Sequence, residues 1–329
     1  MRLPVEMRPF PSTSLRASPS TPLRASLVAS VAAVLLSTGA CVDIVGADFQ
    51  RYVDRQEKQF SVAGKPDVSL ATFNGSIEIR PWDRQEVQVI VEKRASSKES
   101  ADEIEIHTEQ QANRIVVDVK VPRHEGYLHV HHRSAKLIVS MPAAADVLAK
   151  SGDGAIDVEG IAGRIELRSG DGSIRARRLD GDINVQTGDG SIRLESMNGA
   201  LRVNTGDGGI VADGTFTSVR ARSGDGSVRI AAEPGSTLNG DWDISTGDGT
   251  VTLALPEGFN AEIDAHTGDG RIHLQDLTLT NVTGRIGRNS VRGRLGEGGS
   301  IVRVRSGDGS ITLKRSDAAL STTLPAERP

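Results

Sequence analysis

The chain has 329 residues, a formal net charge of −4, 37% hydrophobic residues and only 3% aromatic residues. The share of hydrophobic residues excludes wholesale disorder, and the negative net charge argues against a basic surface for nucleic acid. The scarcity of aromatic residues argues against an aromatic-lined ligand pocket and against stacking platforms for single-stranded nucleic acid. The single cysteine, Cys41, excludes internal disulfides, cysteine-based zinc sites and iron–sulfur clusters.

Residues 1–40 are predicted to be a disordered lead-in followed by a signal peptide. Residues 11–26 form a near-perfect tandem octapeptide, PSTSLRAS and PSTPLRAS. The apolar segment Leu27–Leu36 follows Arg16 and Arg24. This segment is too short to span a bilayer, but it has the length of a signal-peptide core. The sequence therefore predicts an exported protein.

Cys41 is a candidate lipidation site, because residues 37–40 are small or polar and resemble a bacterial lipobox. Thr38 stands where lipoboxes favour leucine, so ordinary cleavage after Ala40, or an uncleaved anchor, are the alternatives. All three place the mature protein outside the cytoplasm. We expect a lipid anchor in the cell envelope, at the outer membrane or in the periplasm, with free secretion as the alternative. Residues 41–59 are expected to be an anchor and linker.

Residues 60–150 alternate apolar and polar side chains without a regular repeat, which predicts an irregular N-terminal β region or cap. Within it, His129 and His131 would lie on one face of a strand. A His-x-His pair can hold Zn²⁺ or Cu²⁺, and an exposed polar strand or loop is the alternative.

The tetrapeptide [Ser/Thr]-Gly-Asp-Gly occurs eight times from residue 151 onward, and its first five copies follow one another at a constant interval. Isoleucine, leucine or valine recurs at half that interval, usually with an apolar partner two positions on. Each 18-residue unit therefore holds two short half-buried strands, which bury their apolar side only when units stack. We predict an all-β, single-chain β-solenoid (β-helix) over 151–315, with an insertion loop near 281–299 and a polar tail over 316–329.

The aspartates of the tetrapeptide are predicted to stack along one edge at the strand spacing of about 4.8 Å. One interpretation is that each carboxylate accepts turn amides while solvent screens the charges. The second is a line of Ca²⁺ sites, and the third is a glycosidase or lyase built on these acids. The candidate metal ligands are Asp171, Asp189, Asp207 and Asp225. We expect no other cofactor and no catalytic residue.

Arginines also recur in rows on the outward side of the predicted strands, with Arg202 and Arg220 on one row. They are interpreted either as a solvated face with cross-strand ion pairs or as a basic stripe for anionic polysaccharide or lipid headgroups.

The run Thr72–Ile79, the repeated Ser-Gly-Asp-Gly-Ser-Ile and the closing Ser306–Leu313 resemble a bacterial β-strand-repeat family of unknown function labelled "putative adhesin". The resemblance covers roughly Phe60–Lys314. It implies an envelope-associated β-solenoid and brings no catalytic residues with it.

We therefore expect a non-enzymatic, exported β-solenoid that serves as an adhesin-like surface or interaction module of the cell envelope. Its expected partners are an envelope protein or polysaccharide, and the membrane through a lipid at Cys41, but not nucleic acid. A periplasmic ion- or polysaccharide-binding sensor module is the alternative, and a carbohydrate-active β-helix enzyme is the third hypothesis.

Overall fold

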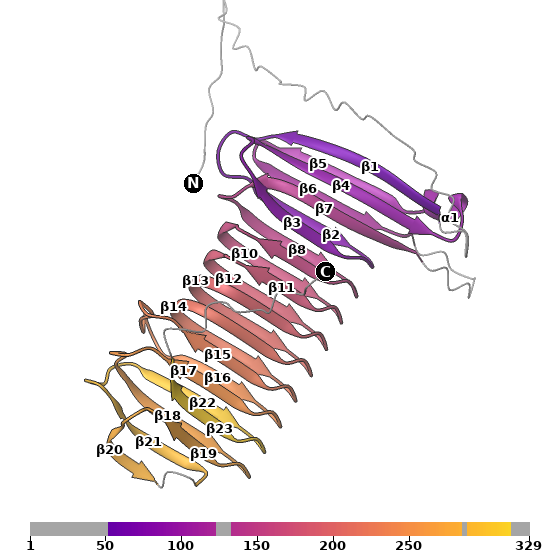
Figure 1. The fold of residues 1–329 in the computed structure, drawn as a ribbon. Helices are drawn as coiled ribbons and strands as arrows, with labels where there is room; N and C mark the ends of the chain where they lie inside the picture. The colour runs from indigo at the N-terminus through magenta and orange to yellow at the C-terminus, as the bar shows by residue number, and fades with distance from the viewer. Residues whose placement is uncertain (1–51, 123–132, 285–287, 317–329) are drawn as a thin grey trace, which may run out of the picture. The chain divides into compact units, whose positions relative to one another are not determined.

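The computed structural model describes residues 52–122, 133–284 and 288–316, where almost all regular structure is β-strand (Figure 1). The helix α1 (Lys98–Asp102) begins after Ser97, whose hydroxyl accepts a hydrogen bond from the N–H of Ser100. Within the described ranges, the structure contains no helix with the length and hydrophobicity of a membrane span. The strands before the regular repeat are β1 (Tyr52–Ser61), β2 (Asp67–Thr72), β3 (Ile77–Trp82), β4 (Glu86–Ala95), β5 (Glu105–Gln111), β6 (Arg114–Lys120) and β7 (Ser134–Pro142).

The strands of the regular repeat alternate between two faces of a coil, so that one strand from each face makes one rung. They are β8 (Asp146–Ser151), β9 (Ile156–Glu159), β10 (Ala162–Ser169), β11 (Ile174–Arg177), β12 (Asp180–Thr187), β13 (Ile192–Thr205), β14 (Ile210–Ser223), β15 (Val228–Ala232), β16 (Trp242–Thr246) and β17 (Val251–Leu255). The remaining strands are β18 (Ala261–Thr267), β19 (Ile272–Gln275), β20 (Thr280–Gly284), β21 (Ser290–Leu295), β22 (Ile301–Ser306) and β23 (Ile311–Arg315).

Face I contains β8, β10 and β12, and face II contains β9 and β11. The long strands β13 and β14 run from face II through a corner into face I. Neighbouring rungs pair in parallel, and each residue lies opposite its counterpart one repeat away. On face I, Ile183 lies opposite Ile165 and Leu201. On face II, Ile192 lies opposite Ile174 and Ile210.

The apolar columns fill the space between the two faces. Ile165, Ile183 and Leu201 are 0%, 3% and 2% exposed, and Ile192 is 1% exposed. Because side chains of a strand alternate in direction, the residues between them face outward and are polar. The predicted β-solenoid with two strands in each rung is therefore confirmed.

The rungs do not stack in the order of the sequence at either end. At the C-terminal end, β22 pairs with β16 on one side and with β18 on the other, and β23 lies between β17 and β19 in the same way. Figure 1 shows these yellow strands between orange ones. At the N-terminal end, β2 lies between β6 and β8, and β3 lies between β7 and β9. The first and last rungs of the described chain are thus enclosed by other rungs.

Antiparallel strands cover both ends of the stack. β5 pairs with β6, and β1 pairs with β4, which pairs with β7. At the other end β18 pairs with β21, which pairs with β20. A parallel stack would otherwise present open hydrogen-bonding edges, and terminal caps of this kind are general in solenoid proteins.

Two segments differ from their sequence-based interpretation. Residues 52–59, expected to be part of an anchor and linker, belong to the strand β1, which borders β4 along its whole length. The segment near 281–299, expected to be an insertion loop, contains most of β20 and all of β21. The loop prediction failed because these strands pair antiparallel and so lack the period of the repeat. The other domain boundaries stay predictions.

Candidate functional site: turn edge, ion-paired face and charged groove

The tetrapeptide turns form one edge of the stack, and their serine or threonine hydroxyl holds each turn to its neighbour. Ser169 donates to the carbonyl oxygen of Gly154 at 2.9 Å and accepts from the N–H of Gly172 at 3.1 Å. Ser151 donates to Gly75 in the same way at 2.8 Å. The turn before β3 is therefore the degenerate first copy of the tetrapeptide.

The turn aspartates play a different part from the one we expected. Their carboxylates are exposed and make no hydrogen bond or ion pair within the described chain, so the interpretation that they accept turn amides is wrong. The turn amide donates instead to the hydroxyl of the serine or threonine two residues before the aspartate, because this hydroxyl is buried directly under the turn. These aspartates are Asp153, Asp171, Asp189, Asp207, Asp225, Asp248, Asp269 and Asp308.

No group of three or more histidine, cysteine, aspartate or glutamate side chains in the described ranges could hold a metal ion. The turn aspartates follow one another singly, one to a rung. His129, His131 and Cys41 lie outside the described residues, so the metal and lipid hypotheses for them stay predictions.

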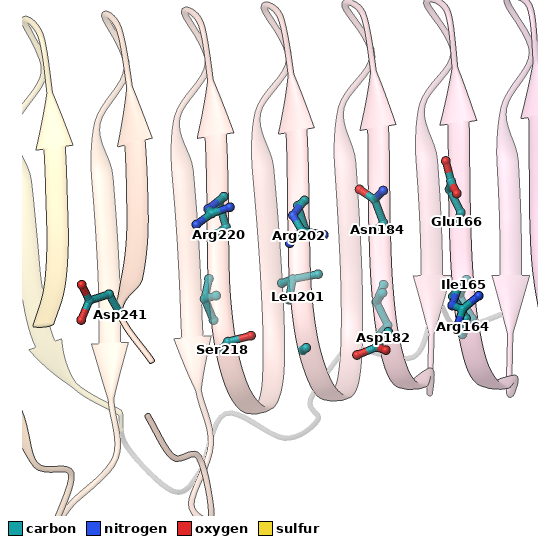
Figure 2. A pocket seen from close by; sticks show the side chains of 13 residues that line it. Arg164, Ile165, Glu166, Asp182, Asn184, Leu201, Arg202, Ser218, Arg220 and Asp241 are labelled. Carbon is teal, nitrogen blue, oxygen red and sulfur yellow. The ribbon is translucent and has the colours of Figure 1, made fainter. Parts of the chain in front are cut away.

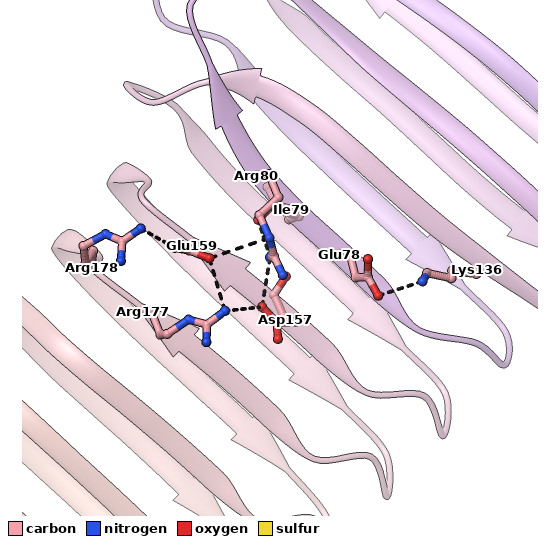
Figure 3. Close-up of polar contacts among 8 residues, drawn as sticks. All are labelled: Glu78, Ile79, Arg80, Lys136, Asp157, Glu159, Arg177 and Arg178. Atoms are coloured by element: carbon pink, nitrogen blue, oxygen red, sulfur yellow. Dashed lines mark hydrogen bonds and ion pairs between the residues drawn. The ribbon is translucent and has the colours of Figure 1, made fainter. Parts of the chain in front are cut away.

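Ion pairs cover the outside of face II near its N-terminal end (Figure 3). Glu159 of β9 binds Arg177 at 3.2 Å and also pairs with Arg178. Arg80 of β3 binds Asp157 at 2.9 Å. Burial acts to raise the pKa of Glu159, but the two arginine guanidinium groups outweigh it and hold that pKa below its ordinary value. This part of the surface is the solvated, cross-strand-paired face that the sequence suggested.

Asp213 of β14 is also on face II, and its pKa is raised above the ordinary value. Burial is the main cause, and the nearby carboxylate of Glu195 adds to it. The carboxylate accepts a 2.9 Å hydrogen bond from the backbone N–H of Ser196, which has a φ of 57° at a break in the strand register. Asp213 thus closes an irregular corner of the coil.

A groove of about 400 Å³ lies on the outside of face I and is lined by residues of five neighbouring rungs (Figure 2). Its floor is the backbone at Ile165, Ile183, Leu201 and Val219, whose side chains point into the core. Two rows of outward side chains, at alternate positions along each strand, form its walls. The first row is Arg164, Asp182, Ala200, Ser218 and Asp241, and the second is Glu166, Asn184, Arg202 and Arg220.

The parallel register places like positions of successive rungs side by side. Arg202 lies directly opposite Arg220, and Ala200 lies directly opposite Ser218. The small side chains of Ala200 and Ser218 leave the hollow, and the two arginines border it. In the first row, Asp182 and Asp241 flank Ala200 and Ser218 on either side.

The charges around the hollow are only partly paired. Glu166 pairs with Arg168, and Asp241 accepts a 3.0 Å hydrogen bond from the N–H of Ile301. Arg164, Arg202 and Arg220 make no ion pair within the described chain. The side-chain oxygen of Asn184 is buried and has no hydrogen-bond partner there. Buried polar atoms are normally satisfied, so this oxygen is an exception in the wall of the groove.

Sequence reasoning singled out Arg202 and Arg220 but missed the rest of the groove. Asn184, Ala200 and Ser218 are unremarkable as residues, and only the parallel register of the repeats brings Ala200 and Ser218 together. Asp241 follows Ser218 across a unit that is longer than the regular repeat, so the period gave no signal for it.

The sequence model of the Toastrack DUF4097 family matches residues 67–314. No curated protein matches the chain. Among solved structures, a "putative cell adhesion protein" from Clostridium sporogenes is 14% identical, with 80% of this chain and 100% of that chain covered and a TM-score of 0.25. A "putative adhesin" from Bacteroides fragilis is 11% identical, with 79% and 97% covered and a TM-score of 0.40.

Proposed function

Since the chain belongs to the Toastrack DUF4097 family, we propose that its β-solenoid is an exported interaction module of the cell envelope that binds a partner and catalyses no reaction. The observation that carries this proposal is the charged groove on face I, a hollow that crosses several rungs and is bordered by arginines without ion-pair partners in the described chain.

Binding rather than catalysis is favoured by how the acidic groups are distributed. Hydrolysis of a sugar chain by carboxylates requires two acids whose environments set their pKa values apart, facing each other across a cleft. Within the ranges that the structure describes, the carboxyl group with a raised pKa is that of Asp213, which lies on face II and accepts a hydrogen bond from the backbone of Ser196. The groove is on face I. The turn aspartates repeat one environment from rung to rung.

The proposed location follows from the N-terminal sequence. The apolar core Leu27–Leu36 would direct export, and a diacylglycerol on Cys41 would then tether the solenoid to a membrane. A lipidated cysteine carries several acyl chains, and more than one chain is needed for stable anchoring.

Fractionation of cells that express the full chain tests the location. We expect the wild type in the membrane fraction and Cys41→Ser in the soluble exported fraction, with a mature mass that lacks the lipid. A wild type that is soluble and exported with a free Cys41 thiol would replace lipidation by plain secretion. Retention in the cytoplasm would overturn the proposed function.

Co-sedimentation with washed cell envelopes tests the binding role. Purified full-length protein should be retained in a saturable way, and a heat-unfolded sample serves as the control. Retention that does not saturate, or that the unfolded sample reproduces, would contradict a specific interaction module.

A further inference from the structure

We propose that the groove on face I binds an acidic sugar unit of a polysaccharide, with its carboxylate on Arg202 and Arg220 and its hydroxyl groups on Asp182, Ser218 and Asp241. This inference rests on the proposed function and names the partner class. It combines the pairing register, the unpaired charges and the chemistry of the hollow.

The anionic end of the ligand follows from the two arginines. They are opposite each other on neighbouring strands, which are about 4.8 Å apart, and they carry like charges without a carboxylate between them. Two guanidinium groups at that spacing repel each other. A ligand carboxylate between them removes the repulsion and accepts charge-assisted, bidentate hydrogen bonds.

The hydroxyl-bearing end follows from the opposite wall. Carboxylates accept hydrogen bonds and donate none, so Asp182 and the second oxygen of Asp241, which Ile301 does not use, can accept from ligand hydroxyl groups. Ser218, between them in the row, can donate or accept. A ring with several hydroxyl groups on one side and a carboxylate on the other satisfies both walls at once, and an acidic sugar has this arrangement.

The form of the groove favours a chain over a single small molecule. The hollow extends across neighbouring parallel strands rather than closing around one point. Arg164 lies in the first row two rungs before Ala200, and Asn184 lies in the second row between Glu166 and Arg202. Successive sugar units would therefore meet polar side chains on successive rungs.

A protein partner fits this surface less well. Protein interfaces depend on apolar and aromatic anchors, and in the described ranges Val282 is the only large hydrophobic side chain that is exposed. A membrane surface also fits poorly. Asp182 and Asp241 border the arginines and would repel a layer of anionic headgroups.

Calorimetric titration of the full-length protein with polyuronate oligomers tests the proposal, using oligogalacturonate and alginate oligomers as probes. Neutral oligosaccharides with reduced carboxyl groups, inorganic phosphate and vesicles containing phosphatidylglycerol are the comparison ligands. We expect at least one polyuronate to bind, its neutral form to bind at least about tenfold more weakly, and vesicles and phosphate not to compete with it.

Variants locate the binding to the groove. Arg202→Gln combined with Arg220→Gln should raise the Kd by at least about tenfold, and Ala200→Tyr, which fills the hollow from an outward position, should abolish binding. Arg175→Gln combined with Arg229→Gln is the matched control, since both arginines are exposed on face II and have no ion pair in the described chain. This control should bind like the wild type. Circular dichroism melting confirms that each variant folds.

Three results would overturn the proposal: binding of neither polyuronate, equal loss in the face II control, or tighter binding to anionic vesicles than to polyuronate. The proposed function fails separately. If the double groove variant still co-sediments with envelopes as the wild type does, and the wild type ignores polyuronates, the interaction module stands and the acidic-sugar site falls. If the wild type is not exported, the envelope function falls whatever the groove binds.

Discussion

Gly206 donates its backbone N–H to the carbonyl oxygen of Gly188, 2.5 Å away in the preceding rung. The same bond joins the first glycines of the other tetrapeptides, including Gly224 to Gly206 and Gly247 to Gly224. The turns are therefore in backbone contact from rung to rung. Glycine is needed there because a side chain would stand where the neighbouring carbonyl lies, and not because of a special φ.

Gly206→Ala should destabilise the fold by about 2 kcal/mol or more, because its Cβ would lie 2.7 Å from the Gly188 oxygen and the backbones would have to separate. Gly209→Ala is the matched control, since its Cβ would meet nothing nearer than 3.5 Å, at the oxygen of Ser227. Urea unfolding of the two variants measures the difference. Equal midpoints would contradict the close-contact explanation.

Thr205→Val should cost about 1–3 kcal/mol of unfolding free energy. The buried hydroxyl of Thr205 is shared between the carbonyl oxygens of Gly188 and Gly190, at 3.1 and 3.0 Å, and valine would leave both without it. Asp207→Asn, in the same turn, should be neutral or slightly stabilising at low salt, because neighbouring carboxylates repel. If Asp207→Asn proved to be the more damaging change, the carboxylate would have a structural role that its exposed position does not explain.

Millimolar Ca²⁺ or a chelator should leave the melting temperature of the full chain almost unchanged. We expect no shift because each turn offers only one carboxylate to an ion. If an ion did bind, it would stabilise the fold by about 2.7 kcal/mol at a hundredfold excess over its Kd. The triple variant Asp171→Asn, Asp189→Asn and Asp207→Asn is the control. A rise of several degrees with Ca²⁺ that disappears in this variant would establish the ion-binding alternative.

Asp264→Asn should destabilise the C-terminal rungs by about 1–3 kcal/mol at pH 7. Asp264 of β18 binds Arg305 of the enclosed strand β22 at 2.8 Å and Arg292 of β21 at 3.2 Å. Burial acts to raise the pKa of Asp264, but the two arginines outweigh it and hold the pKa below its ordinary value. The contribution of the ionised Asp264 to the free energy of unfolding is therefore complete above the ordinary carboxyl pKa. It is lost as the pH falls through the lowered pKa of the folded state.

The difference between wild type and Asp264→Asn should consequently shrink as unfolding is measured at increasingly acid pH. Asp243→Asn is the control, because Asp243 has one exposed arginine partner, Arg222, at 3.1 Å. It should cost less than about 1 kcal/mol. If the difference in unfolding free energy between wild type and Asp264→Asn did not change with pH, packing rather than charge would stabilise the enclosed rung.

Asp213→Asn should stabilise the protein at pH 7, since the folded state must hold a charge there that burial disfavours. Because the folded pKa is raised, the wild type loses stability as pH rises from the ordinary carboxyl pKa through the raised one. The advantage of the variant should appear over that window and vanish below it. The side-chain oxygen of asparagine can still accept from Ser196. Thermal melting from acid to neutral pH measures this, and a destabilised variant at pH 7 would contradict it.

The coil could be predicted from the repeat, because every repeat contains the same local pattern of apolar and polar residues. Ile174, Ile192 and Ile210 occur once in each successive repeat and face inward, so the two-strand rung and its buried columns could be predicted without a structure. The turn was predicted, but the group that satisfies it was not. Asp189 and the neighbouring Thr187 are both good turn residues, and only burial decides that Thr187 bonds to the adjacent rung.

The rung, with its two strands, its apolar columns and its glycine turns, can therefore be predicted from the sequence. The order of the rungs cannot, because it depends on how distant segments pair. Rungs of one length and pattern can stack on any other, so the period does not say that β22 lies between β16 and β18. The antiparallel end strands, which no repeat predicts, favour this order of rungs. At the C-terminal end β21 pairs with one side of β18, so β22 pairs with the other side. The groove depends on the same step, because Ala200 and Ser218 form a hollow only when their strands lie side by side.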